Sequence, residues 1–438
     1  MARRLVVLAV FAAVLLYTFH LYSFRYFLLD DFNNLGIVQS ETTGHIFRYL
    51  LDPTSDFFRP GAMILYRLLW IAAGLHYAPY AWFAFALHVL NTWLLYRVLL
   101  RVTRAPLATA CGTLLFALQP TFAGVYFTFG TVFDLSCATV MLLALLAHMH
   151  LERPWQGGLA LAALLFWAMK CKEMAISLPA ICLSYDLLIA QRRGVRAYLV
   201  RFGPSAIVAG WFLYVRLKQM LEPRPDDAYH MEISARAFLR GLGWYCNVLV
   251  DPIAVTARNW GRWGVGWALG LAWLAFRRDR QALFFAACIL FGLLPVLFLP
   301  NHRSTFYWYL PFLGVAGLAS LLVHRAARFA TPSPGTALVG FCLLAAVHVP
   351  LSTVRGRPER AFFAALCVEY RAFVEGAQRL PPPPRGATVH VDSRPRLFSD
   401  VVLTSALQVI FRDPTLSATS AGAADYHIDF QHGEVVRR

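Results

Sequence analysis

Two adjacent carboxylates stand where the first long apolar segment of the chain gives way to polar residues. They are Asp30 and Asp31, in the run FLLDDFNN at 27–34. A carboxylate can take the proton of a hydroxyl group as that oxygen attacks an electrophilic carbon, which is general base catalysis. A second carboxylate nearby raises the pKa of the first toward the range in which a base is most useful. The pair is therefore a candidate catalytic base, and the alternative is a solvated loop that marks a helix end.

Three basic side chains occupy short polar breaks between apolar runs. Arg59 lies in FFRPGAMILYRLLW (57–70), Lys172 lies beside Glu173 at the tip of a hairpin, and Arg303 lies in NHRSTFYWYLPFLG (301–314). Guanidinium and ammonium groups bind phosphate through charge-assisted hydrogen bonds. We therefore take the three as candidate phosphate ligands, with Glu173 holding Lys172 in place. The alternatives are arginine side chains that snorkel to a membrane interface and an exposed hairpin tip.

A further group of polar residues falls inside apolar runs. His88 and Asn91, in LHVLN, are three residues apart and share one face of a helix, whereas Asp134 follows FGTVF. Polar residues at membrane depth usually face the interior of the bundle. For His88 and Asn91 we favour hydrogen bonding between helices. For Asp134 both a functional role and a basic structural partner such as Lys170 stay open.

The elements that must position these residues are long apolar helices. Of the 438 residues, 58% are hydrophobic and 15% are charged, against roughly 45–50% and about 25% in soluble domains. A bilayer core needs about 20 apolar residues in helical form, because lipid offers no partners to the backbone. The sequence predicts an all-α polytopic membrane protein of about eleven transmembrane helices, at 5–24, 79–100, 105–122, 130–149, 157–172, 174–190, 198–217, 262–276, 281–299, 307–323 and 336–352.

The basic residues set the expected orientation. Clusters such as Arg192, Arg193 and Arg196 fall between spans in alternate loops, as the positive-inside rule requires of cytosolic loops. This orientation puts two long loops outside, at 25–78 and 218–261, and makes the short apolar stretch 61–75 an interfacial or re-entrant helix. Residues 1–352 are then the membrane core. Residues 353–438, with the strand-like run ATVHVDS at 387–393, are predicted to form a small α/β appendage on the outer side.

Other classes of function find little support. The net charge of +16 lies in the short loops and forms no basic face, so we expect no nucleic-acid partner. The eight cysteines include no CxxC pair and lie mostly in apolar runs, so we interpret them as packing residues. We predict no metal ligands, although the acidic pair leaves a divalent ion possible.

The order of the motifs resembles one family. The runs FRP…Y, LHVLN, LFALQP, FGTVFD, KEMAISLPAICLSYDLL and YLPFLG occur between about 25 and 320. They resemble the membrane core of the C-type (GT-C) glycosyltransferase superfamily, specifically protein O-mannosyltransferase-like proteins with transmembrane and tetratricopeptide regions. The resemblance implies a polyprenyl-phosphate sugar donor. It also implies roles: Asp30 or Asp31 as the base, Arg59, Lys172 and Arg303 on the donor phosphate, and His88, Asp134 and Glu173 in support.

The resulting hypothesis is an inverting transferase that needs no cofactor. It would move a sugar from a polyprenyl-phosphate donor among membrane lipids to a protein, lipid or glycan hydroxyl, on the periplasmic side of a bacterial inner membrane. A transporter or flippase of lipid-linked sugars predicts charges spread through the depth of the spans. Six of the charged residues are instead expected to gather at one face: Asp30, Asp31, Arg59, Lys172, Glu173 and Arg303. A non-catalytic binder of lipid-linked sugars is the third possibility.

Overall fold

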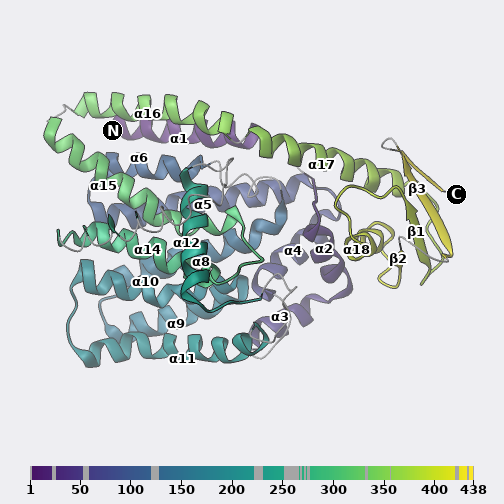
Figure 1. Cartoon of the computed structure of the whole chain (residues 1–438), viewed down its shortest axis with the longest axis horizontal. Helices are drawn as coiled ribbons and strands as arrows, with labels where there is room; N and C mark the ends of the chain where they lie inside the picture. Colours follow the sequence, from purple (N-terminus) through teal and green to yellow (C-terminus); the bar gives the residue numbers. More distant parts are fainter. Residues whose placement is uncertain are drawn as a thin grey trace. The chain divides into compact units, whose positions relative to one another are not determined.

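The computed structural model describes residues 2–21, 26–52, 59–119, 128–220, 230–250, 266, 269–270, 273, 277–330, 334–355, 357–419, 424–431 and 434–437. Within this part the chain is mostly helical (Figure 1). It divides into two compact units. Unit 1 comprises Met1–Thr18, Leu87–Phe122 and Phe133–Gly356. Unit 2 comprises Phe19–Ala86, Ala123–Val132 and Arg357–Arg438.

Unit 1 is built from apolar helices. They are most of α1 (Ala2–Leu21), the later part of α5 (Ala78–Thr103), α6 (Pro106–Ala117), α8 (Val132–His150), α9 (Pro154–Cys171), α10 (Leu178–Tyr185), α11 (Val195–Met220), α12 (Ala235–Val250), α14 (Arg280–Leu297), α15 (Phe312–Ala330) and α16 (Pro334–Arg355). Helix α9 packs along α11, α6 packs against α15 and α16, and α14 packs against α10, α12 and α15.

Glycines permit the closest of these contacts. A Cβ added at Gly112 of α6 would lie 2.2 Å from the carbonyl oxygen of Ala316 in α15. A Cβ at Gly314 would lie 2.2 Å from the carbonyl oxygen of Phe285 in α14. These helices therefore meet backbone to backbone, as small residues allow in membrane bundles.

The stretch predicted as one helix at 174–190 contains three kinds of helix. It begins with a 3₁₀ turn, η3 (Glu173–Ser177), continues as α10 and ends in a π-helical turn, η4 (Asp186–Ala190). Pro179 lacks the N–H group that would bond four residues back, so α-helical bonding is established only after it. The helix expected at 307–323 starts later than predicted. Helix α15 begins at Phe312, directly after Pro311.

Five helical segments of the described residues are long and apolar enough to cross a membrane: Ala78–Thr103, Phe129–His150, Glu173–Ala190, Val195–Val215 and Arg280–Leu297. Most of the span predicted at 262–276 lies outside the described residues. An integral membrane protein fits these lengths, whereas the number of eleven spans stays a prediction.

Unit 2 combines short helices with a small sheet. Its helices are α2 (Asp30–Ser40), α3 (Thr43–Leu51), α4 (Pro60–Ala73), the start of α5, a 3₁₀ turn η2 (Phe129–Thr131), α17 (Arg357–Ala377) and α18 (Asp400–Phe411). The strands are β1 (Thr388–Asp392), β2 (Ser417–Thr419), β3 (Tyr426–Gln431) and β4 (Glu434–Arg437), in the order β2-β1-β3-β4. Strand β1 is parallel to β2 and β3, and β4 is antiparallel to β3.

The C-terminal elements pack onto the helices that carry the acidic pair. Helix α18 lies against both α2 and β2, and α17 lies against β4. The strand expected at 387–393 is present as β1, and a helix follows it. A boundary at 352 between a membrane core and a separate outer domain stays a prediction, since 357–438 share one compact unit with 19–86.

Candidate active site

The carboxylate of Asp31 is held by four hydrogen-bond donors of unit 2. The side chain is fully buried at the start of α2. Its Oδ1 accepts a hydrogen bond from the hydroxyl of Tyr66 at 2.7 Å. Its Oδ2 accepts from the backbone N–H of Leu28 at 2.9 Å, the hydroxyl of Thr128 at 3.0 Å and the N–H of Phe129 at 3.3 Å. Both oxygens of Asp31 are therefore occupied by protein donors.

Burial and hydrogen bonding act in opposite directions on this carboxyl group. Loss of hydration raises the pKa of Asp31 to about 6, and the bonds from Tyr66, Leu28 and Thr128 limit the rise. The negative charge of the neighbouring Asp30 adds to the rise. At neutral pH Asp31 is therefore mostly ionised, and its charge is distributed over the donors that surround it.

Asp30 lies in a different environment from its neighbour. Its side chain is exposed, whereas Asp31 has no exposed surface. The preceding residue, Leu29, has a φ of 29°, a conformation that a leucine adopts only at an energetic cost. This backbone geometry starts α2 with one carboxylate directed into the protein and the next one accessible. Of the two carboxylates predicted as the base, Asp30 is the one that a substrate can reach.

Helix α4 brings a predicted phosphate ligand into the same unit. Arg59 is its N-cap, buried and in the left-handed conformation with a φ of 53°. Tyr66 follows seven residues later, so both residues lie on one face, about 10 Å apart along the helix axis. Tyr66 also accepts a hydrogen bond from Asn34 of α2, at 3.3 Å. The start of α4, with Arg59, is thus fixed relative to the acidic pair.

The FGTVFD motif serves as a support for Asp31. Thr128 and Phe129 donate two of its hydrogen bonds, and Gly130 lets the turn approach closely. A Cβ at Gly130 would lie 3.3 Å from the hydroxyl of Thr128 and 3.6 Å from Oδ1 of Asp31. The sequence did not identify Tyr66, Asn34 or Thr128. The available signals were their places beside the motifs: Asn34 ends FLLDDFNN, Tyr66 belongs to FRP…Y, and Thr128 directly precedes FGTVFD.

In unit 1, the ammonium group of Lys172 pairs with Asp134. The Nζ–Oδ1 distance is 2.5 Å, and the two side chains are 8% and 7% exposed. The same ammonium lies 4.7 Å from the centre of the Tyr307 ring. The basic partner of Asp134 is thus Lys172, whereas Lys170 lies over the ring of Phe166. Glu173, half-buried, begins the 3₁₀ turn after Lys172.

Arg303 lies in a basic and aromatic neighbourhood of unit 1. Burial lowers the pKa of Arg303, the nearby Tyr245 opposes this effect, and the positive charge of Arg240 adds to it. The next residues along the chain are packed, because Trp308 donates to the carbonyl of Tyr245 at 3.0 Å. His302 meets the ring of Tyr307 at 5.7 Å. The sequence analysis did not single out Arg240, whose positive charge acts on Arg303.

His88 and Asn91 hold helices together. His88 is fully buried, and its Nδ1 lies 2.8 Å from the hydroxyl of Tyr309. Asn91 donates to the same hydroxyl at 3.3 Å and to the carbonyl of Leu135 in α8 at 2.9 Å. Thr139 of α8 donates to the amide oxygen of Asn91 at 2.7 Å. This network is the hydrogen bonding between helices that the sequence favoured.

The described residues show neither a metal-binding cluster nor a disulfide. No group of three or more His, Cys, Asp or Glu side chains among them is arranged to hold a metal ion. All eight cysteines are free thiols, and seven of them are buried. Packing is the role that these positions support for the cysteines, and the cofactor requirement stays a prediction.

Comparison with known proteins finds likenesses among solved structures only. No family model and no curated protein matches the sequence. Among solved structures, the chain is similar to the crystal structure of ArnT from Cupriavidus metallidurans in the apo state. The identity is 16% and the TM-score 0.48, over 95% of this chain and 86% of that one. A likeness of this degree does not establish a shared activity, which we argue from the residues.

Proposed function

We propose that this protein is a membrane glycosyltransferase that moves a sugar from a polyprenyl-phosphate donor to a hydroxyl acceptor at the extracytoplasmic face. The observation that carries the proposal is the division of the acidic pair. Asp31 is buried and bonded by four donors, whereas Asp30 is exposed beside it. A fold that fixes one carboxylate and leaves its neighbour accessible supplies a positioned base.

In the proposed reaction one proton is transferred, one bond to the anomeric carbon forms and one bond breaks. The Asp30 carboxylate takes the proton of the acceptor hydroxyl while that oxygen bonds to the anomeric carbon. The bond from that carbon to the phosphate oxygen breaks, and the polyprenyl phosphate leaves with the electron pair, so the anomeric centre is inverted. Arg59, anchored through α4, supports the proposal as a partner of the leaving phosphate. By the resemblance, Lys172 and Arg303 have the same role, and His88, Asp134 and Glu173 are supporting residues.

The test compares single carboxylate variants of the full chain in nanodiscs. Radiolabelled polyprenyl-phosphate sugars and a crude membrane acceptor fraction are supplied, and transfer of label is measured. We expect Asp30→Asn to lower the transfer rate by about 10²–10⁴-fold with donor affinity unchanged, because only the base is lost. Glu41→Gln removes a carboxylate of the same loop, one that pairs with His45, and is the matched control.

Two results would contradict the proposal. The first is transfer at the wild-type rate in Asp30→Asn, which would show that Asp30 is not the base. The second is an absence of transfer from every donor by a wild-type protein that binds these lipids or carries them across a bilayer, which would favour the transporter.

A further inference from the structure

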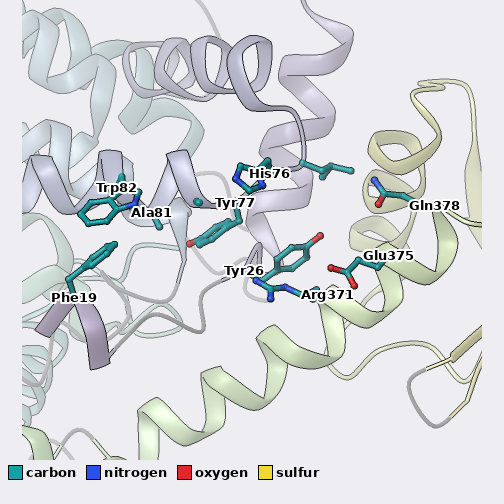
Figure 2. Close-up of a pocket in the computed structure, with 11 residues that line it drawn as sticks. Phe19, Tyr26, His76, Tyr77, Ala81, Trp82, Arg371, Glu375 and Gln378 are labelled. Atoms are coloured by element: carbon teal, nitrogen blue, oxygen red, sulfur yellow. The ribbon is translucent and has the colours of Figure 1, made fainter. Parts of the chain in front are cut away.

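Unit 2 contains a cavity of about 720 Å³ that the acidic pair does not line (Figure 2). Its size falls within the range of small-molecule sites, about 300–1,000 Å³. It lies between the turn before α5, the segment before α2 and one face of α17. The residues that line it are Phe19, Tyr26, Leu75, His76, Tyr77, Ala78, Ala81, Trp82, Arg371, Glu375 and Gln378.

One side of the cavity is aromatic. Phe19 and Trp82 lie together, with ring centres 4.1 Å apart, and Tyr26 and Tyr77 lie 6.1 Å apart (Figure 2). Tyr26 and Tyr77 are buried and held in place, whereas Trp82 is 53% exposed. The C–H face of a sugar ring stacks on such aromatic surfaces, because the ring face is apolar and its hydroxyl groups point outward.

The opposite side is a polar stripe along the end of α17. Arg371 and Glu375 are four residues apart on one face of the helix, and Gln378 follows directly after its last residue, Ala377; all three side chains are exposed. They supply a donor, an acceptor and an amide that does both. Hydroxyl groups donate and accept, so this set can satisfy several of them at once. The guanidinium of Arg371 is itself held over the ring of Tyr26, at 5.3 Å.

The charges of the cavity balance. Burial raises the pKa of the Tyr26 hydroxyl, Glu375 adds to the rise and Arg371 opposes it, so the two charged side chains act on it with opposite sign. A phosphate site needs surplus positive charge, which this cavity lacks. An alkyl chain would desolvate the polar stripe without offering it partners, which is costly. A neutral, hydroxyl-rich ring meets both requirements.

The cavity wall is continuous with the acidic pair. Tyr26 and Tyr77 both pack edge-on against Phe27, at 5.4 and 4.9 Å. The next residue, Leu28, donates its N–H to Asp31. We propose that this cavity binds a neutral sugar ring. The inference rests on the proposed function, in which such a ring belongs either to a glycan acceptor or to the donor. If it belongs to the acceptor, the acceptor is a glycan.

The experiment measures binding without turnover. Full-length protein in nanodiscs free of glycoside detergent is titrated with methyl glycosides of glucose, mannose, galactose and N-acetylglucosamine, followed by saturation-transfer NMR. We expect at least one neutral glycoside to bind. Trp82→Ala and Glu375→Ala should each weaken binding by roughly threefold to tenfold, the effect of one lost contact or hydrogen bond. Trp93→Ala, on the same helix and 52% exposed, should change nothing.

The source of the ring follows from a second titration with polyprenyl-phosphate sugar. Weaker donor binding in Trp82→Ala assigns the ring to the donor, whereas unchanged donor binding with a raised KM for a glycan assigns it to the acceptor. The inference is overturned if no glycoside binds, if Trp82→Ala and Glu375→Ala bind as well as wild type, or if glucose 6-phosphate or dodecanoate binds better than every neutral sugar. Glycoside binding by a protein that transfers no sugar would contradict the proposed function alone.

Discussion

The buried pair of Lys172 and Asp134 allows a quantitative test of the core of unit 1. Both side chains are under a tenth exposed, and their charged atoms are 2.5 Å apart. Lys172→Met would leave the Asp134 carboxylate buried without a counter-charge. Removing one partner of such a pair costs about 3–5 kcal/mol, whereas replacing both by apolar residues is close to neutral. We therefore expect Lys172→Met to lower the free energy of unfolding by about 3–5 kcal/mol. The double variant, with Lys172→Met and Asp134→Leu, should recover most of this loss.

The assay is the free energy of unfolding in mixed micelles, from the SDS dependence of tryptophan fluorescence. Lys170→Met is the control, because Lys170 lies two residues away and contacts the ring of Phe166. Lys170 is half-buried, and a cation–π contact of that kind contributes about 0.5–2 kcal/mol, less than the buried ion pair. The reasoning fails if the double variant is no more stable than Lys172→Met, or if Lys170→Met is equally damaging.

The double variant also separates the two roles of Lys172. If donor affinity recovers together with stability, the ion pair serves only the fold. If donor binding stays about tenfold weaker in a protein of restored stability, Lys172 also contacts the phosphate, as the resemblance implies. Without the double variant, a loss of activity in Lys172→Met would not distinguish these roles.

Two further measurements address the packing. Burial raises the pKa of Asp31 from 3.8 to about 6, so the folded protein binds more protons than the unfolded chain between these values. Its free energy of unfolding should rise as the pH falls through that window, by up to about 3 kcal/mol. Asp31→Asn should lose this rise. An equal rise in the variant would show that another group than Asp31 is responsible. Gly112→Ala should destabilise by more than about 2 kcal/mol through its clash with the backbone of Ala316. Gly210→Ala, where a Cβ meets nothing within 4 Å, should be tolerated, and equal thermal stabilities of the two variants would contradict the close helix contact.

The helices were largely predictable from local composition. Runs of about 20 apolar residues have few alternatives to a helix in lipid, and α5, α8, α9, α11 and α14 fall where the sequence placed spans. Proline explains the late starts of α10 and α15, because Pro179 and Pro311 interrupt backbone hydrogen bonding inside the predicted spans. A hydropathy pattern contains no information on that interruption.

What the sequence by itself determined is which residue types are present and where along the chain they fall. It placed two carboxylates after the first apolar run, a lysine at a hairpin tip, and His88 and Asn91 on one helix face. Only the tertiary structure distinguished Asp30 from Asp31, because the donors that bury Asp31 come from Tyr66 and Thr128, 35 and 97 positions away. The same holds for Asp134, whose partner lies 38 residues along the chain. Adjacent residues share a local sequence, and their different roles arise from contacts between distant segments.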